Sequence, residues 1–287
     1  MTKALTVPFV LLAMLVMALP AAAQQPRDPQ ETIKQIQALA WVHGPADASI
    51  GSLATIKVPK GLSFLDGPNT RKFLELNLNP PRDNHYTLSS QDFSWFAVFY
   101  FESAGYVKDD EKLDPDALLK SLQASDDRAN AERKRLNMPA INTAGWHVPP
   151  HYDPATKRLE WGVKLRQSDV GNDVVNYTIR ILGRRGVMHV TLVSDPQELD
   201  KDIVVFKSAL GGYDFSAGER YSEFKAGDKV AEYGLVALVA GGAGVLAAKT
   251  GLLAKFWKLL IIPIVAVGAF FKRLFGGGKK EASEGSV

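Results

Sequence analysis

The clearest pattern along the chain is a strict alternation of apolar and polar side chains in two neighbouring segments. In KRLEWGVKLR (157–166) and VNYTIRIL (175–182) the apolar residues fall on every second position, which is typical of half-buried antiparallel strands. The turn sequence GRRG (183–186) then leads into VMHVTLV (187–193). These segments together predict an antiparallel meander of three strands.

A second pattern marks residues 95–101, where every side chain is apolar. A strand that is apolar on both faces must be covered on both faces. We therefore expect this strand at the centre of a sheet that has a layer of structure on each side.

Helices are indicated by capping residues followed by apolar side chains at helical spacing. Asp28, Pro29 and Glu31 begin the first helix, and Asp114 and Asp195 begin two later ones. The remaining expected elements are one strand in 52–65 that ends at 59–61, a short strand at 213–216 and a short helix over 67–77. The sum predicts an α+β fold, an antiparallel sheet of five or six strands with packed helices, arranged like an α/β/α sandwich.

Two long apolar runs, 233–248 and 259–271, follow this domain. Neither run carries polar residues at the helical spacing that the outer face of a soluble helix requires, so both are apolar all round. We therefore expect a membrane anchor within 233–271, with a wholly soluble helical hairpin as the alternative.

The number of spans stays open between one and two. If Lys255 and Lys258 extend to one interface, residues 252–271 form a 20-residue stretch about 30 Å long, which is enough to cross. The basic sequence KRLFGGGKK (272–280) would then stay in the cytoplasm, and one span is favoured. Lys249, with the other two lysines, argues instead for a two-helix hairpin.

The first residues have the features of a secretory signal peptide. A short basic start, an apolar run and the sequence ALPAAAQQ place the cleavage site after Ala23. We expect the main domain on the periplasmic or extracytoplasmic side of the inner (cytoplasmic) membrane. The predicted organisation is a signal peptide (1–23), an exported domain (24–216), a juxtamembrane segment (217–232), an anchor (233–271) and a basic, polar tail (272–287).

Composition excludes some chemistry. The chain has no cysteine, so thiol catalysis and thiolate metal sites are ruled out. Residues 231–287 carry seven basic and three acidic residues. The positive charge therefore belongs to the tail rather than to the domain, and nucleic acid is not an expected partner.

Candidate catalytic groups are few. His147 and His151 have the spacing of a zinc pair on a helix, but PP at 149–150 forbids that helix and no further ligand completes the site. A rigid proline corner is the simpler interpretation. Glu102 and the acidic run at 109–111 could flank a cleft, although such a run is typical of a solvated loop. We assign no catalytic, cofactor or metal residues.

Four residues are candidates for contact with a partner or with lipid. Arg184 and Arg185 are expected at the tip of a hairpin, where long cations can reach phosphate headgroups or an acidic protein. Tyr221 and Phe224 belong to GERYSEFKAGDKVAEYG (218–234), which is too charged for a core and too aromatic for a loose linker. We expect this segment to dock at the membrane surface or on the domain.

The sequences PPHYD, VNYTIRILGRRGVMHVTLV and GDKVAEYGLVALVAGGAG resemble those of a bacterial family of membrane-anchored proteins whose domain has no known function. The resemblance covers about residues 30–275 and implies export and a C-terminal anchor, but no activity or catalytic residue. The order of elements is also similar to the small α/β/α sandwich of the photosystem-associated PsbP-like proteins, at the level of fold only.

These observations favour a non-enzymatic cell-envelope protein that binds an envelope protein or lipid. Its expected partners are the bilayer, an unknown envelope protein and a second copy through Gly241, Gly242 and Gly244. The alternative is a membrane-tethered hydrolase or other envelope enzyme that uses Glu102 or the histidines at 147 and 151. A third hypothesis, in which the membrane helices themselves act, lacks the intramembrane polar residues typical of that role.

Overall fold

The computed structural model describes residues 29–77, 79, 81–135, 140–167 and 173–240. Its main sheet has eight strands, and every neighbouring pair is antiparallel. In spatial order the strands are β1 (Val42–His43), β4 (Leu62–Leu65), β5 (His85–Ser90), β6 (Trp95–Glu102), β10 (Val187–Ser194), β9 (Asp173–Leu182), β8 (Arg158–Gln167) and β7 (Ile141–Asp153).

The main sheet is made of two meanders that meet in the middle. β4, β5 and β6 form the first meander, and β7, β8, β9 and β10 form the second. They join through β6 and β10, where Phe99 lies opposite Val190 and Tyr100 opposite His189. The meander predicted from 157–193 and the central position of the apolar strand at 95–101 are both confirmed.

One face of the main sheet is covered by a small sheet and a helix. The small sheet has the order β11 (Tyr213–Phe215), β3 (Ala54–Val58) and β2 (Ala46–Ile50), and the helix is α4 (Leu199–Leu210). Phe99 meets the ring of Phe206 from α4 edge to face at 6.3 Å and stacks on Tyr213 at 6.5 Å. Together these elements enclose the largest apolar core of the molecule.

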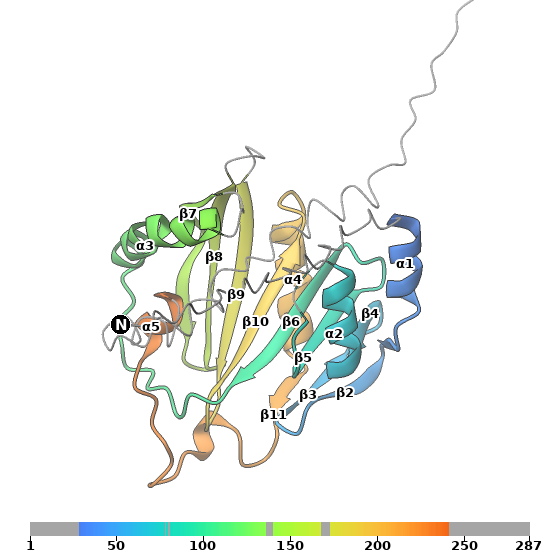
Figure 1. Cartoon of the computed structure of the whole chain (residues 1–287). Coiled ribbons are helices and arrows are strands. Elements are labelled where there is room, and N and C mark those ends of the chain that lie inside the picture. The colour runs from blue at the N-terminus through green and yellow to red at the C-terminus, as the bar shows by residue number, and fades with distance from the viewer. Residues whose placement is uncertain (1–28, 78, 80, 136–139, 168–172, 241–287) are drawn as a thin grey trace, which may run out of the picture.

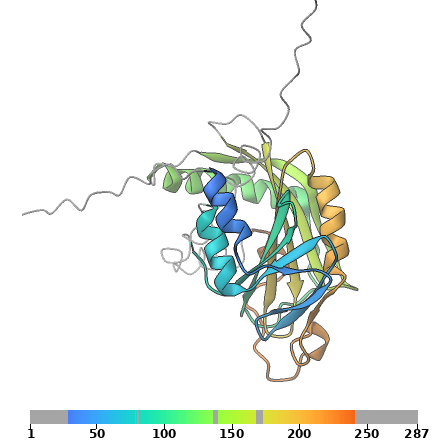
Figure 2. The ribbon, with the colours of Figure 1, turned by 90° about the vertical axis from the view of Figure 1, so that its right-hand side faces the viewer.

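Helices cover the two ends of the opposite face, and they are α1 (Pro29–Gln37), α2 (Gly67–Leu76), α3 (Pro115–Arg135) and α5 (Leu235–Ala240). Near β5 and β6, Phe73 of α2 packs on Phe96 with ring centroids 5.0 Å apart. Near β8, Leu118 of α3 and Leu235 of α5 share a separate apolar cluster with Trp161. Figure 1 shows α2 and α3 over opposite ends of the sheet, and Figure 2 shows α4 on the other side of the sheet from α1 and α2.

The prediction of five or six strands was wrong, because the main sheet alone has eight. We interpreted 147–151 as a proline corner, yet it lies within the 13-residue strand β7. Proline cannot donate a hydrogen bond to a neighbouring strand and is confined to edges and irregular positions. β7 satisfies that condition because it is an edge strand whose register shifts between Val148 and His151.

Among the described residues, no helix is both long enough and apolar enough to cross a membrane. The predicted signal peptide (1–23) and tail (272–287) lie outside those residues, as do most of the predicted anchor and Gly241, Gly242 and Gly244. Of the predicted anchor, the structure describes residues 233–240, which contain α5.

Candidate functional site

A line of polar side chains crosses the middle of the helix-covered face. His85 of β5 lies opposite Tyr100 of β6, which lies opposite His189 of β10, which in turn lies opposite Arg180 of β9. Directly opposite residues of paired strands project from the same face. The ring of Tyr100 stacks between the two histidines, 4.9 Å from His85 and 4.5 Å from His189. We call these four residues the polar row.

The polar row lies between the two apolar clusters that the helices form. Val98, two residues before Tyr100, belongs to the cluster under α2, and Trp161 of β8 belongs to the cluster under α3 and α5. We interpreted the alternation in β9 as a half-buried strand with a solvated polar side. The structure instead buries much of that side, including Thr178, at the centre of the sheet.

His189 is the most deeply buried member of the row, with 6% of its surface exposed. Its Nε2 lies 2.7 Å from Oε2 of Glu102, and the other oxygen of that carboxylate accepts a hydrogen bond from the Tyr233 hydroxyl at 2.9 Å. Burial, and then the charge of Arg180, lower the pKa of His189 to about 4. Contact with His189 is the main cause that lowers the pKa of Glu102. At neutral pH the histidine is therefore uncharged and the glutamate is ionised.

Arg180 ends the row on the side of β8. Its guanidinium lies 5.1 Å from the centre of the Trp161 ring, and Nη1 donates to the carbonyl of Ile179 at 3.2 Å. No carboxylate of the described chain lies within 4.0 Å of this guanidinium. Among the described residues, Nε of Arg180 and both ring nitrogens of His189 are buried without a hydrogen bond of good geometry, although Nε2 of His189 lies 2.7 Å from the Glu102 carboxylate. Such groups are uncommon in folded proteins, and each calls for an explanation such as a bound water, a bound ion or a functional role.

A second group of contacts holds residues 224–240 against the domain. Arg184, in the turn between β9 and β10, binds both oxygens of Asp228, with Nε and Nη2 at 2.6 and 2.8 Å. Tyr233 donates to Glu102, and the backbone N–H of Val236 donates to Glu111 at 2.8 Å. We call these three contacts the clamp. Residues 217–232, which the sequence predicts to be a juxtamembrane segment, therefore contact the domain through Asp228, one of the two locations that the sequence predicts.

The four residues proposed as a partner or lipid surface make contacts within the chain. Arg184 belongs to the clamp, and Arg185 pairs with Glu219. Tyr221 is buried, whereas Phe224 is 38% exposed and packs on another ring. These contacts explain how the four residues are positioned. Their role as a binding surface stays a prediction.

The acidic run at 109–111 is more ordered than a solvated loop. Asp109 accepts hydrogen bonds from Tyr152 at 2.6 Å and from Lys157 and Tyr221 at 2.9 Å each. After burial, which acts in the opposite direction, these three bonds lower its pKa. The carboxylate therefore joins β7, the turn before β8 and the segment after β11.

The rival catalytic residues do not meet. Nε2 of His147 lies 2.6 Å from Asp200 of α4, and His151 is exposed on the same edge strand. Three strands separate β7 from β6, which carries Glu102. Within the described ranges, no three metal-ligating side chains come together.

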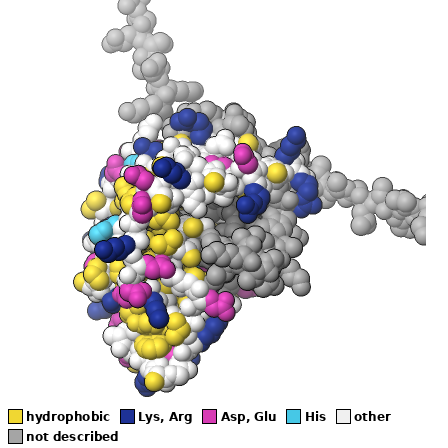
Figure 3. All heavy atoms as spheres, turned by 90° about the vertical axis from the view of Figure 1, so that its left-hand side faces the viewer, with side chains coloured by type: hydrophobic (Ala, Val, Ile, Leu, Met, Phe, Trp, Pro, Cys, Tyr) yellow, Lys and Arg dark blue, Asp and Glu magenta, His cyan; other side chains and the backbone are white. Residues whose placement is uncertain are grey.

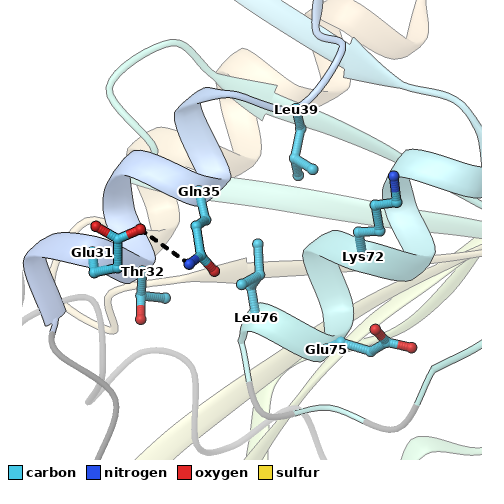
Figure 4. A pocket seen from close by; sticks show the side chains of 7 residues that line it. All are labelled: Glu31, Thr32, Gln35, Leu39, Lys72, Glu75 and Leu76. Carbon is cyan, nitrogen blue, oxygen red and sulfur yellow. Dashed lines mark hydrogen bonds between the residues drawn. The ribbon is translucent and has the colours of Figure 1, made fainter.

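Two surface hollows flank α2. The first, between α1 and α2, has a volume of about 550 Å³ (Figure 4). Gln35 donates to Glu31 at 3.1 Å across one turn of α1, on the wall of this hollow. The second, of about 700 Å³, lies on the side of α2 that faces Tyr86. Both have mixed charge, so neither selects a ligand class.

The surface at the β7 end of the molecule also has mixed charge. Hydrophobic, acidic and basic side chains are interspersed there, and the described surface in this view shows no large area of one sign (Figure 3). Charge alone therefore identifies no partner on this side.

Comparison with known proteins identifies a family that the chain matches. A family model described as "Protein of unknown function (DUF2167)" matches residues 42–271. No curated protein matches the sequence. Among solved structures, the solution structure of cyanobacterial PsbP (CyanoP) from Synechocystis sp. PCC 6803 matches with 9% identity and a TM-score of 0.33, covering 60% of this chain and 92% of that chain.

The family match confirms part of the resemblance seen in the sequence, namely a domain of unknown function. It spans the main sheet, the polar row and the clamp. Because it covers well over half of the residues, this chain belongs to the DUF2167 family.

Proposed function

We propose that this chain is a binding module of the cell envelope. Residues 1–23 serve as the export signal, and residues 233–271 anchor the chain in the inner membrane with the domain on the extracytoplasmic side. The clamp is the observation that carries the proposal. It ties the segment that leads into the apolar run to three separate parts of the domain, namely β6, the β9–β10 turn and the loop after β6.

A clamp of this kind gives the domain a defined position relative to an anchor. A bidentate arginine–carboxylate pair fixes both distance and angle, unlike a single contact. The side chains of Arg184 and Asp228 are only 17% and 16% exposed, so solvent screens their pair less than a surface pair. A domain held in this way presents the same surface toward the membrane and toward its neighbours. That property suits binding to an envelope protein or to lipid, with Arg184, Arg185, Tyr221 and Phe224 as the nearest candidates.

Binding is favoured over hydrolysis because Glu102 lies on β6, whereas His147 and His151 lie on β7, with three strands between them. The carboxylate of Glu102 instead contacts Nε2 of His189 and accepts a hydrogen bond from the Tyr233 hydroxyl. A hydrolase needs a nucleophile, a base and an anion-binding group within hydrogen-bond reach of one substrate, and these residues do not provide that arrangement.

The first experiment tests the anchor and its topology. The full chain is expressed in a bacterial host, and its membranes are washed with alkaline carbonate and treated with protease from the extracytoplasmic side. We expect cleavage after Ala23, retention in the membrane and digestion of the domain. Release of the mature chain by carbonate alone would contradict the anchor.

The second experiment tests the clamp. Limited proteolysis of the full chain is compared with that of Arg184→Met, and Arg220→Met serves as the matched control. Arg220 forms a similar bidentate pair with Asp214, at 2.7 Å, outside the clamp. We expect faster cleavage within 225–232 only in Arg184→Met, because the loss of the pair with Asp228 releases the segment. Equal cleavage in all three proteins would disprove the clamp.

A further inference from the structure

The polar row contains buried nitrogen atoms with unused hydrogen-bonding capacity, with His189 deeply buried and His85, Tyr100 and Arg180 half-buried. Burying a polar group is costly unless another group replaces the lost water. Nδ1 of His189 and Nε of Arg180 are buried and have no such replacement among the described residues. The two residues are directly opposite in paired strands, so their Cβ atoms lie about 5 Å apart and one small ligand can reach both.

The charges around the row favour an anion. Arg82, in the loop before β5, is close enough for its charge to lower the pKa of His85, after the larger effect of burial. Neither Arg82 nor Arg180 has a carboxylate within 4.0 Å among the residues that the structure describes. Glu102, the acidic group of this cluster, is already engaged by Tyr233 and His189. The row therefore has a cation near each end and the Glu102 carboxylate between them, while Asp83, whose charge also acts on His85, is paired with Arg71.

The contact with Glu102 determines whether Nδ1 of His189 donates or accepts a hydrogen bond. A neutral imidazole has one N–H donor and one acceptor nitrogen. Nε2 faces an ionised carboxylate at 2.7 Å, so Nε2 carries the proton and Nδ1 is the acceptor. A ligand at Nδ1 must therefore donate a hydrogen bond, while Arg180 next to it donates to negative oxygens.

We infer that the polar row binds a small oxyanion that also carries a hydroxyl group, such as hydrogen phosphate or a hydroxycarboxylate. The anionic oxygens bind Arg180, and the hydroxyl donates to Nδ1 of His189. This site is independent of the envelope role proposed above, because it lies on the sheet and needs neither the anchor nor a protein partner.

The test compares matched ligands on the full chain in detergent micelles. Binding of inorganic phosphate, lactate and propionate is measured by isothermal titration calorimetry at pH 7. Lactate and propionate share the carboxylate and differ by the hydroxyl group. We expect lactate to bind about tenfold more tightly than propionate, because only lactate satisfies the acceptor nitrogen. Saturable binding of phosphate but not lactate would identify the phosphate class, and the reverse would identify the hydroxycarboxylate class.

Two variants test the location. Arg180→Met should reduce the affinity for the ligand that binds by at least about tenfold, because the guanidinium fork is lost. Arg158→Met is the control, because Arg158 lies on the neighbouring strand β8 with its side chain directed to Leu210 on the opposite face. Its affinity should stay within about twofold of the unmodified chain.

If Arg180→Met does not fold, NMR of the unmodified protein still tests the site. The chain has five histidines, so selective ¹⁵N labelling can resolve the Nδ1 resonance of His189 in the unmodified protein. We expect this resonance to shift on addition of the ligand that binds. The inference is overturned by an unchanged His189 resonance, by saturable binding of lactate and propionate with equal affinity, or by the absence of saturable binding of both phosphate and lactate up to about 10 mM.

Discussion

The two faces of the central strands have different chemical character. On β6, Trp95, Ala97 and Phe99 point toward α4 and the small sheet, and none is more than 3% exposed. On the opposite face of the same strand, Tyr100 and Glu102 join the polar row and the clamp. Burial of apolar surface contributes about 25 cal/mol per Å² to stability, whereas burial of polar groups costs free energy unless they are paired. The first face therefore stabilises the domain, and the second carries its specific chemistry.

The polar character is confined to the middle of the second face. Phe96 and Val98 of β6 lie on that same face and are buried under α2 in an ordinary apolar cluster. The polar residues lie between the part of the sheet that α2 covers and the part that α3 and α5 cover. A face with no role beyond stability would be expected to continue the apolar pattern across this gap.

The largest expected effect is on the apolar face. Phe99→Ala removes a fully buried ring that packs on Phe206 and Tyr213. We expect the free energy of unfolding to fall by about 3–5 kcal/mol, since the lost burial and the remaining cavity both destabilise. Val204→Ala is the control, because Val204 is 68% exposed on α4, and should change stability by less than about 0.5 kcal/mol. Urea unfolding of both variants checks this, and similar losses in the two would contradict the assignment of the core.

A smaller effect distinguishes the polar face through its pH dependence. The folded-state pKa of His189 is about 4, below its ordinary value of 6.5, so the unfolded chain binds more protons between these values. Stability should therefore fall as the pH drops from about 6.5 to 4, and this histidine should account for about 3 kcal/mol of the loss. His189→Gln removes that contribution. The measurement is urea unfolding at several pH values, and parallel pH profiles for the two proteins would show that His189 is not buried in its neutral form.

The smallest effect concerns the contact between the polar face and the clamp. Tyr233→Phe removes the hydrogen bond to Glu102 and keeps the ring. We expect a loss of about 1–2 kcal/mol, because the bond is charge-assisted and the carboxylate oxygen loses its donor. Tyr86→Phe is the matched control, since the structure records no hydrogen bond from the Tyr86 hydroxyl to the described residues, and should stay within about 0.5 kcal/mol. Thermal unfolding with both variants measures the difference, and an equal effect of the two would place Tyr233 outside the clamp.

Strong local patterns allowed much of the fold to be predicted from the sequence. The helix beginning at Pro29 and the meander at 157–193 follow from capping and alternation, which depend on residues near one another in the chain. β5 was missed because HYTLSS has little apolar character. Its Thr87 and Ser89 are nevertheless buried, and the Ser89 hydroxyl donates to the carbonyl of Trp95 at 3.0 Å. A hydrogen bond from a partner strand makes that burial favourable, and the strand itself does not reveal it.

By itself, the sequence determined the type of most elements, the family to which the chain belongs and the hydrophobic character of 233–271. Only the tertiary structure decided that the second meander pairs with the first through β6 and β10. That pairing sets one register for residues that are about ninety positions apart, and it brings Tyr100 and Glu102 next to His189. Side-chain alternation shows which residues of a strand share a face, but the partner strand and its register depend on the packing of the whole domain.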